Sequence, residues 1–154
     1  MKIIKYTYKF RLKPDKSEQE ILNRYFGTVR FVFNYFLNQR KEEYLTNKKS
    51  ITYNQQSAKL TELKKLEDKS WLKEINSQTL QYSLKCLDQA YQNFFNKRTK
   101  FPKFKSRKNK NVFTVPQNVE VIDNELIIPK FEKGIKIILH RKIEGKIKKC
   151  SVSK

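Results

Sequence analysis

The spacing of apolar residues over the first half of the chain predicts helices. Apolar positions within residues 21–26 are three or four apart and predict a first helix, for which Asp15 or Ser17 supplies an N-cap. The pair Gly27–Thr28 predicts a break. Apolar positions within residues 29–45 then predict a second helix with one side in the core.

Two more helices are expected after a polar loop. The third is expected to start near Thr52 and to bury its leucines, Leu60, Leu63 and Leu66. The pair Trp71–Leu72 is expected to anchor a turn, and Ser77 is a good N-cap for the fourth helix. The apolar positions of the fourth helix form one stripe: Leu80, Leu84, Leu87, Tyr91, Phe94 and Phe95.

The opposite side of the fourth helix is polar and has two interpretations. It carries Ser77, Gln81, Lys85 and Gln92, with no acid before Asp88. Ser, Gln and Lys side chains can each hydrogen-bond to base edges or to phosphates. Surface helices need a polar side in any case, so an ordinary exposed face is the simpler interpretation of these residues alone.

Both ends of the chain change to patterns typical of strands. Residues 3–12 alternate loosely between apolar and basic positions and predict a strand that Pro14 ends. Runs of β-forming residues between Pro, Gly and Asp-Asn turns predict strands at 112–115, 119–122, 125–128, 135–139 and 147–152. This order predicts an α+β fold, in which the terminal strands form a small antiparallel barrel or sheet and the helices are inserted between them.

Positive charge is concentrated in residues 97–110, the basic segment. It holds eight Lys or Arg and no acid, in a chain whose formal net charge is +20. Like charges at this density must be solvated or neutralised by a polyanion, and phosphate backbones are regular polyanions. Phe101 and Phe104 flank Pro102 and offer rings on which unpaired bases can stack. The segment predicts a nucleic-acid site, with a solvated basic linker as the alternative.

Other classes of function lack the residues that they need. No apolar run reaches membrane-spanning length and no signal core is present, so we expect a cytoplasmic protein associated with the nucleoid and no membrane partner. Two distant cysteines and one histidine provide no metal, redox or cofactor motif, and Cys86 is expected to be a buried thiol beside Leu84 and Leu87. The 15 acids are scattered, so no catalytic residue is expected.

Six segments carry a resemblance to a known family. They are Tyr8–Pro14, Gly27–Asn34, Ser70–Leu72, Ala90–Phe95, Phe101–Lys105 and His140–Ile147. In this order they resemble the N-terminal half of the TnpB (OrfB) family of transposon-encoded RNA-guided nucleases, whose N-terminal region is named a helix-turn-helix transposase domain. The resemblance implies a small antiparallel wedge-type β-barrel, formed by residues 1–14 and 111–154, and an inserted helical recognition lobe, formed by residues 15–110 and ending in the basic segment.

The resemblance also implies site residues. Family positions that read a short duplex DNA motif fall here on Tyr53, Ser57, Ser77, Gln78, Gln81, Gln117 and Asn118. Family positions that grip RNA fall here on Lys103, Phe104, Lys105, Arg107, Lys108, Arg141 and Lys146. Because Ser77 and Gln81 also lie on the polar side of the fourth helix, the resemblance favours a contact surface there. Ser77 and Gln78 stand where the family commonly has Lys and Phe, so the DNA motif need not be the same.

We therefore expect a non-catalytic, nucleic-acid-binding part of a TnpB-like transposon protein, with guide RNA and motif-bearing duplex DNA as partners. The nuclease carboxylates and four-cysteine zinc insert of the family would lie beyond Lys154, so the chain is expected to be truncated and not an enzyme. A separate nuclease-domain polypeptide is a further partner that the resemblance allows. A structural RNA-binding protein explains the charge but not the six segments, and a stand-alone helix-turn-helix regulator does not explain the β-rich last third.

Overall fold

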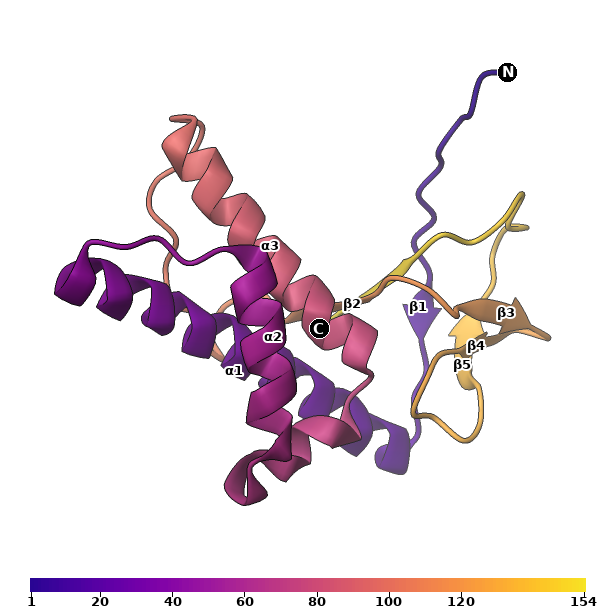
Figure 1. Cartoon of the computed structure of the whole chain (residues 1–154). Coiled ribbons are helices and arrows are strands. Elements are labelled where there is room, and N and C mark those ends of the chain that lie inside the picture. The colour runs from indigo at the N-terminus through magenta and orange to yellow at the C-terminus, as the bar shows by residue number, and fades with distance from the viewer.

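The computed structural model describes all 154 residues and combines helices with short antiparallel strands. The helices are α1 (Lys16–Asn47), α2 (Tyr53–Lys65), the 3₁₀ helix η1 (Glu67–Glu74) and α3 (Ser77–Phe95). The strands are β1 (Arg11–Leu12), β2 (Val112–Val115), β3 (Glu120–Ile122), β4 (Glu125–Ile127), β5 (Ile135–Ile138) and β6 (Cys150–Ser153). Figure 1 shows the helices on one side of the molecule and β3, β4 and β5 on the other, with β2 between them and in contact with α3. The α+β class is confirmed.

Helix α1 is continuous, so the expected break at Gly27–Thr28 is wrong. A capping box begins the helix, in which the Glu18 amide donates to Asp15 Oδ1 (2.8 Å) and the Asp15 amide donates to Glu18 Oε1 (2.9 Å). Gly27 then lies inside the helix, between the buried residues Phe26 and Thr28. An interior glycine weakens a helix by only about 1 kcal/mol, which burial of the neighbouring apolar side chains outweighs.

Replacing Gly27 with alanine is expected to stabilise the protein. An added Cβ would meet nothing closer than Arg30 Nη2 at 3.8 Å, so the methyl group fits. Alanine restricts the unfolded chain more than glycine does, and we expect a gain of about 0.5–1 kcal/mol in the free energy of unfolding by urea denaturation. Gly145→Ala is the control, because Gly145 has a φ of +79° that alanine adopts only with strain. A Gly27→Ala variant no more stable than the parent would contradict this account of the helix.

The starts of α2 and α3 lie where the sequence predicts them, within one residue. The third helix starts near Thr52 as expected, and Thr52 caps α2 in a second capping box with Gln55. Asn76, rather than Ser77, caps α3, because its side chain accepts a hydrogen bond from the Gln78 amide (3.4 Å). Leu60 and Leu63 are buried as expected, but Leu66 at the end of α2 is exposed.

The apolar stripe of α3 is buried over most of its length. Leu80, Leu84, Leu87 and Tyr91 are buried, Phe94 is half-buried and Phe95 is exposed. The helix therefore leaves the core in its last turn.

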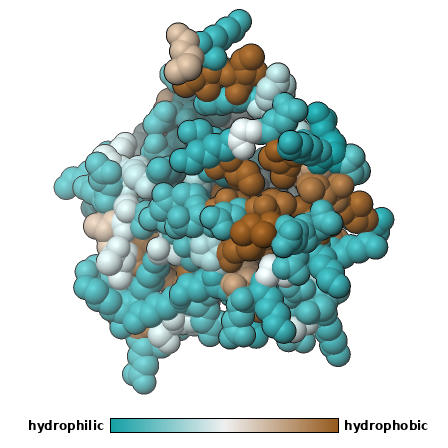
Figure 2. All heavy atoms as spheres, turned by 90° about the vertical axis from the view of Figure 1, so that its right-hand side faces the viewer, coloured by the Kyte–Doolittle hydropathy of each residue, from teal (hydrophilic) through white to brown (hydrophobic).

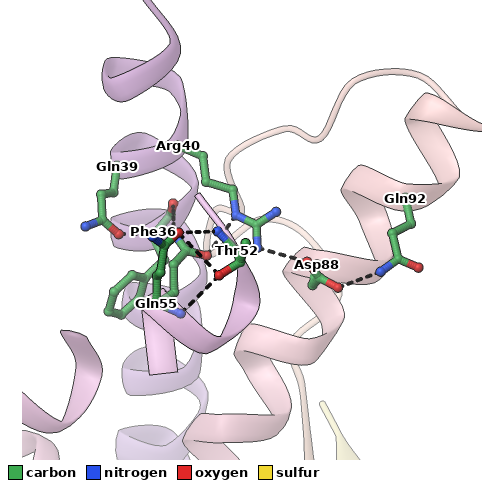
Figure 3. Close-up of polar contacts among 8 residues, drawn as sticks. Phe36, Gln39, Arg40, Thr52, Gln55, Asp88 and Gln92 are labelled. Carbon is green, nitrogen blue, oxygen red and sulfur yellow. Dashed lines mark hydrogen bonds and ion pairs between the residues drawn. The ribbon is translucent and has the colours of Figure 1, made fainter. Parts of the chain in front are cut away.

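A buried polar network joins the three α-helices (Figure 3). Arg40 of α1 is 9% exposed, and it donates from Nε to Gln56 Oε1 of α2 (2.8 Å) and from Nη2 to Asp88 Oδ1 of α3 (3.0 Å). Gln56 is fully buried and donates to the Phe36 carbonyl oxygen (2.9 Å). The Arg40 guanidinium also lies over the Tyr91 ring, 4.8 Å from its centroid. The buried polar groups of the three helices thus form hydrogen bonds with one another, and these bonds fix the relative orientation of the helices.

The strands form two separate sheets. The larger has the order β1-β5-β4-β3, with all pairs antiparallel, and the smaller pairs β2 with β6. In the larger sheet, Arg11 is opposite Ile138, Leu126 is opposite Ile135, and Val121 is opposite Leu126. The predicted strand positions from 112 to 138 are confirmed, and β6 occupies the end of the expected 147–152 strand. Neither sheet closes into a barrel, because no hydrogen-bonded ladder joins the two sheets.

The N-terminal strand is much shorter than expected. Only Arg11–Leu12 pairs with β5, and residues 1–10 have no regular secondary structure. Side chains hold part of this segment instead, since Phe10 packs against His140 (ring centroids 5.1 Å apart) and Arg141 lies over Tyr8 (4.8 Å). Alternation of apolar and basic residues alone does not supply the partner strand that a ladder needs.

One hydrophobic core includes residues of both the helices and the strands. Phe113 of β2 packs against Tyr25 and Phe26 of α1, with ring centroids 4.6 and 5.1 Å apart. The Tyr25 hydroxyl donates to the Pro129 carbonyl (2.8 Å) and accepts from the Asn76 amide (3.4 Å). Burial raises the pKa of the Tyr25 phenol, so the environment favours the neutral form that donates this hydrogen bond. Tyr25 thus ties the β part to the helical part.

The open sheet leaves apolar side chains at the surface. Figure 2, which views the β side, shows them gathered in one area with hydrophilic residues around it. Exposed apolar residues of this part include Ile122, Ile138 and Leu139, and Ile3 and Ile4 are exposed near the N-terminus. A closed barrel would have paired the free edges of β1 and β3, which stay open here.

Candidate nucleic-acid interface

Three of the residues expected to contact DNA meet at one amide group. Gln81 of α3 accepts on Oε1 from the Ser57 hydroxyl (2.8 Å) and from the Tyr53 hydroxyl (3.4 Å), both on α2. All three side chains are half-buried. With its oxygen occupied, the Gln81 amide has its Nε2 group left to donate to a ligand. The cluster therefore presents a positioned donor between α2 and α3.

Ser77 and Gln78 lie next to this cluster, whereas Gln117 and Asn118 lie elsewhere. Ser77 and Gln78 are exposed in the first turn of α3, four and three residues before Gln81 respectively, and hence on neighbouring parts of the helix surface. Gln117 and Asn118 are exposed between β2 and β3, and Asn118 has a φ of +61°. No hydrogen bond joins these last two to the α2–α3 cluster.

The basic segment is attached to α1 by an asparagine. Asn34 donates from Nδ2 to the Lys105 carbonyl and accepts on Oδ1 from the Lys105 amide, each over 2.8 Å. This pair of bonds imitates the pairing of two strands and fixes which residue lies opposite α1. Arg30 adds a second attachment, since its Nη1 donates to Asn111 Oδ1 (3.0 Å) directly after the segment. The segment is therefore anchored at defined residues, unlike a free linker.

The aromatic residues of the segment have different environments. Phe101 packs edge-on against Tyr91 and Phe94 (ring centroids 5.4 and 5.2 Å apart), and Pro102 is buried. Phe104 is 48% exposed, with the ammonium group of Lys41 4.7 Å from its centroid. Phe101 thus packs against the end of α3 while remaining 38% exposed, and Phe104 keeps the larger surface that a base can reach.

The cationic side chains expected to bind RNA are exposed. This holds for Lys103, Lys105, Arg107 and Lys108 in the segment, and for Arg141 and Lys146 after β5. The ammonium group of Lys105 lies over the Phe33 ring of α1 at 4.3 Å, and the Arg141 guanidinium lies over Tyr8. These contacts orient two of the cations while leaving their donors accessible.

Sequence reasoning missed the residues that position the site. Asn34 and Arg30 occupy the polar side of α1, 71 and 81 positions from their partners. Their only signal in the sequence is a polar side chain beside the apolar face of an amphipathic helix. Cys86 was expected to be buried, yet it is exposed on the outer side of α3, because Leu84 and Leu87 face the core and Cys86 does not.

Neither a metal cluster nor a membrane span is present in the structure. No three His, Cys, Asp or Glu side chains lie together in a way that could hold a metal ion. No helix is both long enough and apolar enough to cross a membrane.

The N-terminal third of the chain matches a known protein family. A family model described as a helix-turn-helix domain, of the OrfB/IS605 type, matches residues 1–49. In the structure, residues 16–47 of that match form the single helix α1, so the name of the domain does not describe two helices here.

Three curated proteins are similar to this chain. InsQ of Escherichia coli K12, named as a candidate RNA-guided DNA endonuclease, is 37% identical over 150 residues, which are 96% of this chain and 37% of that protein. A Streptomyces pristinaespiralis protein, also named as a candidate RNA-guided DNA endonuclease, is 41% identical over 108 residues, 70% of this chain and 27% of its own length. The virulence protein VsdF of Salmonella dublin is 34% identical over 106 residues, 63% of this chain and 89% of VsdF. The chain thus spans about a third of the two longer relatives.

Proposed function

Because this chain belongs to the TnpB (OrfB) family, we propose that it is the nucleic-acid-recognition part of an RNA-guided system, binding a guide RNA and a short duplex DNA motif. The two longer relatives are named for RNA-guided cleavage of DNA, and this chain aligns with about a third of their length. In this proposal the helical part acts as a recognition lobe, the strands form the wedge-type part, and cleavage is supplied by residues outside the chain.

The observation that carries the DNA half of the proposal is the hydrogen-bonded cluster around Gln81. Tyr53, Ser57 and Gln81 are uncharged, so they gain little from the phosphate field and are best used on base edges. The two hydroxyls hold the amide oxygen, and the amide nitrogen would donate to a base acceptor such as the N7 or O6 of guanine. Exposed Ser77 and Gln78 would extend this reading surface by one helical turn.

The RNA half rests on the anchored basic segment. Asn34 holds the Lys105 backbone at 2.8 Å in both directions, while the cations around it remain exposed. A flexible linker would show no such attachment. Segment cations fixed in this way can follow a phosphate backbone in one register. Arg141 and Lys146 would extend this contact on the β part.

The two alternative functions explain less of the structure. A structural RNA-binding protein would use the charge but gives no role to the polar cluster between α2 and α3. A stand-alone helix-turn-helix regulator gives no role to the strands of the last third, and residues 16–47 of the segment that the helix-turn-helix model matches form one helix without a turn.

The Gln81→Ala variant tests the proposed DNA surface. We expect preference at one base position of the selected motif to fall by about 1–3 kcal/mol, while the dependence of binding on salt stays the same, because no charge is removed. Motif selection from a randomised duplex library, followed by anisotropy titrations at several salt concentrations, measures both quantities. Gln19→Ala is the matched control, because Gln19 is an exposed helical glutamine, on α1, that belongs to none of the proposed contact surfaces. Unchanged base preference in the Gln81 variant would contradict the assignment.

A further inference from the structure

A second cationic surface runs along the outer side of α3, away from α2. A shallow groove of about 380 Å³ is lined by Tyr82, Lys85, Cys86, Gln89, Ala90 and Asn93, and no acid lines it. At 3.6 residues per turn, most of these positions form one stripe that is centred roughly a quarter turn from Gln81. The groove and the Gln81 cluster therefore occupy different sides of the same helix.

Lysines from distant parts of the chain border this groove. Lys149, just before β6, donates from Nζ to the Tyr82 hydroxyl (3.1 Å). The ammonium groups of Lys105 and Lys149 both lower the pKa of the Cys86 thiol, against the larger effect of surrounding protein atoms, which raises it. Lys149 thus adjoins the groove through Tyr82, and Lys105 belongs to the anchored basic segment. Together with Lys85 on the groove wall, they provide three cations, which come from the basic segment, from α3 and from the residue before β6.

We propose that this groove binds the backbone of single-stranded RNA, as a continuation of the path that starts on the basic segment. Three cations and no acid suit a chain of phosphates, and the half-buried ring of Tyr82 offers a surface for an unpaired base. Lys105 lies in the anchored segment with its ammonium group over the Phe33 ring of α1, and α1 packs against α3, so one strand can contact both the segment and the groove. This inference rests on the proposed RNA-binding function and adds Tyr82, Lys85 and Lys149 to its contact residues.

Under this proposal α3 separates the two nucleic acids. Its first turns and the side toward α2 face DNA, through Ser77 and Gln81, and its outer side faces RNA, through Lys85 and Cys86. The groove residues do not share the hydrogen bonds of the DNA cluster, and only Lys85, one turn after Gln81, adjoins it. The two surfaces can therefore be tested with separate variants.

The test combines a charge change with protection of Cys86. A Lys85→Ala, Lys149→Ala double variant is titrated with a labelled 20-nucleotide single-stranded RNA across a range of salt concentrations. We expect the affinity at 0.1 M salt to fall on the order of tenfold, and the slope of log affinity against log salt to become shallower by about 1.4, as for two lost phosphate contacts. Lys16→Ala, Lys73→Ala is the matched control, because it removes the same charge from exposed positions outside the groove. An equal loss in both variants would overturn the proposal.

Alkylation of Cys86 by iodoacetamide gives the second readout. The thiol is exposed in the free protein, and we expect bound RNA to slow its modification severalfold, with partly buried Cys150 as the internal control. RNA binding without protection of Cys86 would overturn the groove assignment and leave the proposed RNA function intact. Absence of any RNA binding would overturn both. Protection by duplex DNA of the same length, but not by the RNA, would assign the groove to DNA and overturn the proposal.

Discussion

Replacing Arg40 with methionine is expected to lower the free energy of unfolding by about 3 kcal/mol. The change leaves the fully buried Gln56 without its donor and the Asp88 carboxylate, 26% exposed, without its cation. It also removes the guanidinium from the Tyr91 ring. For a domain of this size the midpoint of thermal unfolding should fall by roughly 6–12 °C. Circular dichroism during heating and in urea measures both effects.

Arg24→Met is the matched control for this prediction. Arg24 lies on the same helix, and its contact with Glu74 is 3.8 Å long and about 60% exposed on both sides. An exposed pair of this kind contributes about 0–1 kcal/mol, so the control should remain close to the parent. Equal stability of the Arg40 and Arg24 variants would mean that the network in Figure 3 does not hold the three helices together.

Removing the charge of the basic segment is expected to cause the largest loss of RNA affinity. The variant changes Lys103, Lys105, Arg107 and Lys108 to alanine. If each neutralises one phosphate of a single strand, affinity at 0.1 M salt should fall roughly 10²–10³-fold, and the salt slope should become shallower by about 3. Anisotropy titrations of a labelled single-stranded RNA from 50 to 200 mM salt provide both numbers.

Two comparisons distinguish a defined site from general positive charge. Alanine at four exposed lysines outside the segment, Lys16, Lys59, Lys73 and Lys133, removes the same charge and should weaken binding much less. Asn34→Ala removes the anchor of Lys105 and no charge, so it should lower affinity while the salt slope stays close to that of the parent. Equal effects of the two quadruple variants would contradict an anchored RNA site.

Local patterns in the sequence predicted the elements whose causes are local. Thr52 and Gln55 form a capping box within four residues, and the strand positions follow from β-forming runs between turns. Gly27 misled the prediction, because a glycine is a local signal for a break while the packing that keeps α1 intact is not local. The prediction was also wrong for residues 3–10, where it expected a strand. Their apolar and basic residues alternate as in a strand, but no partner strand pairs with them.

In the candidate site, too, the sequence indicated individual residues but not the contacts between residues far apart in the chain. The resemblance indicated Tyr53, Ser57 and Gln81, but only the structure shows that they share one amide oxygen, because they are 24 and 28 positions apart. The anchor of the basic segment joins residues 71 positions apart and leaves no pattern in the sequence. Helical spacing could have placed Cys86 outside the buried stripe, but its two leucine neighbours in sequence suggested the opposite.

The position of Tyr25 has a consequence for exchanging segments between relatives. Its ring packs against Phe113, and its hydroxyl contacts both Asn76 and Pro129, so it touches partners on both sides of residue 111. A chimera joined at that residue would combine one protein's Tyr25 with another protein's strands. The contacts between the helical part and the β part would then not match. Recombination, natural or engineered, should therefore yield folded hybrids only when Tyr25 and its partners Asn76, Phe113 and Pro129 come from the same parent.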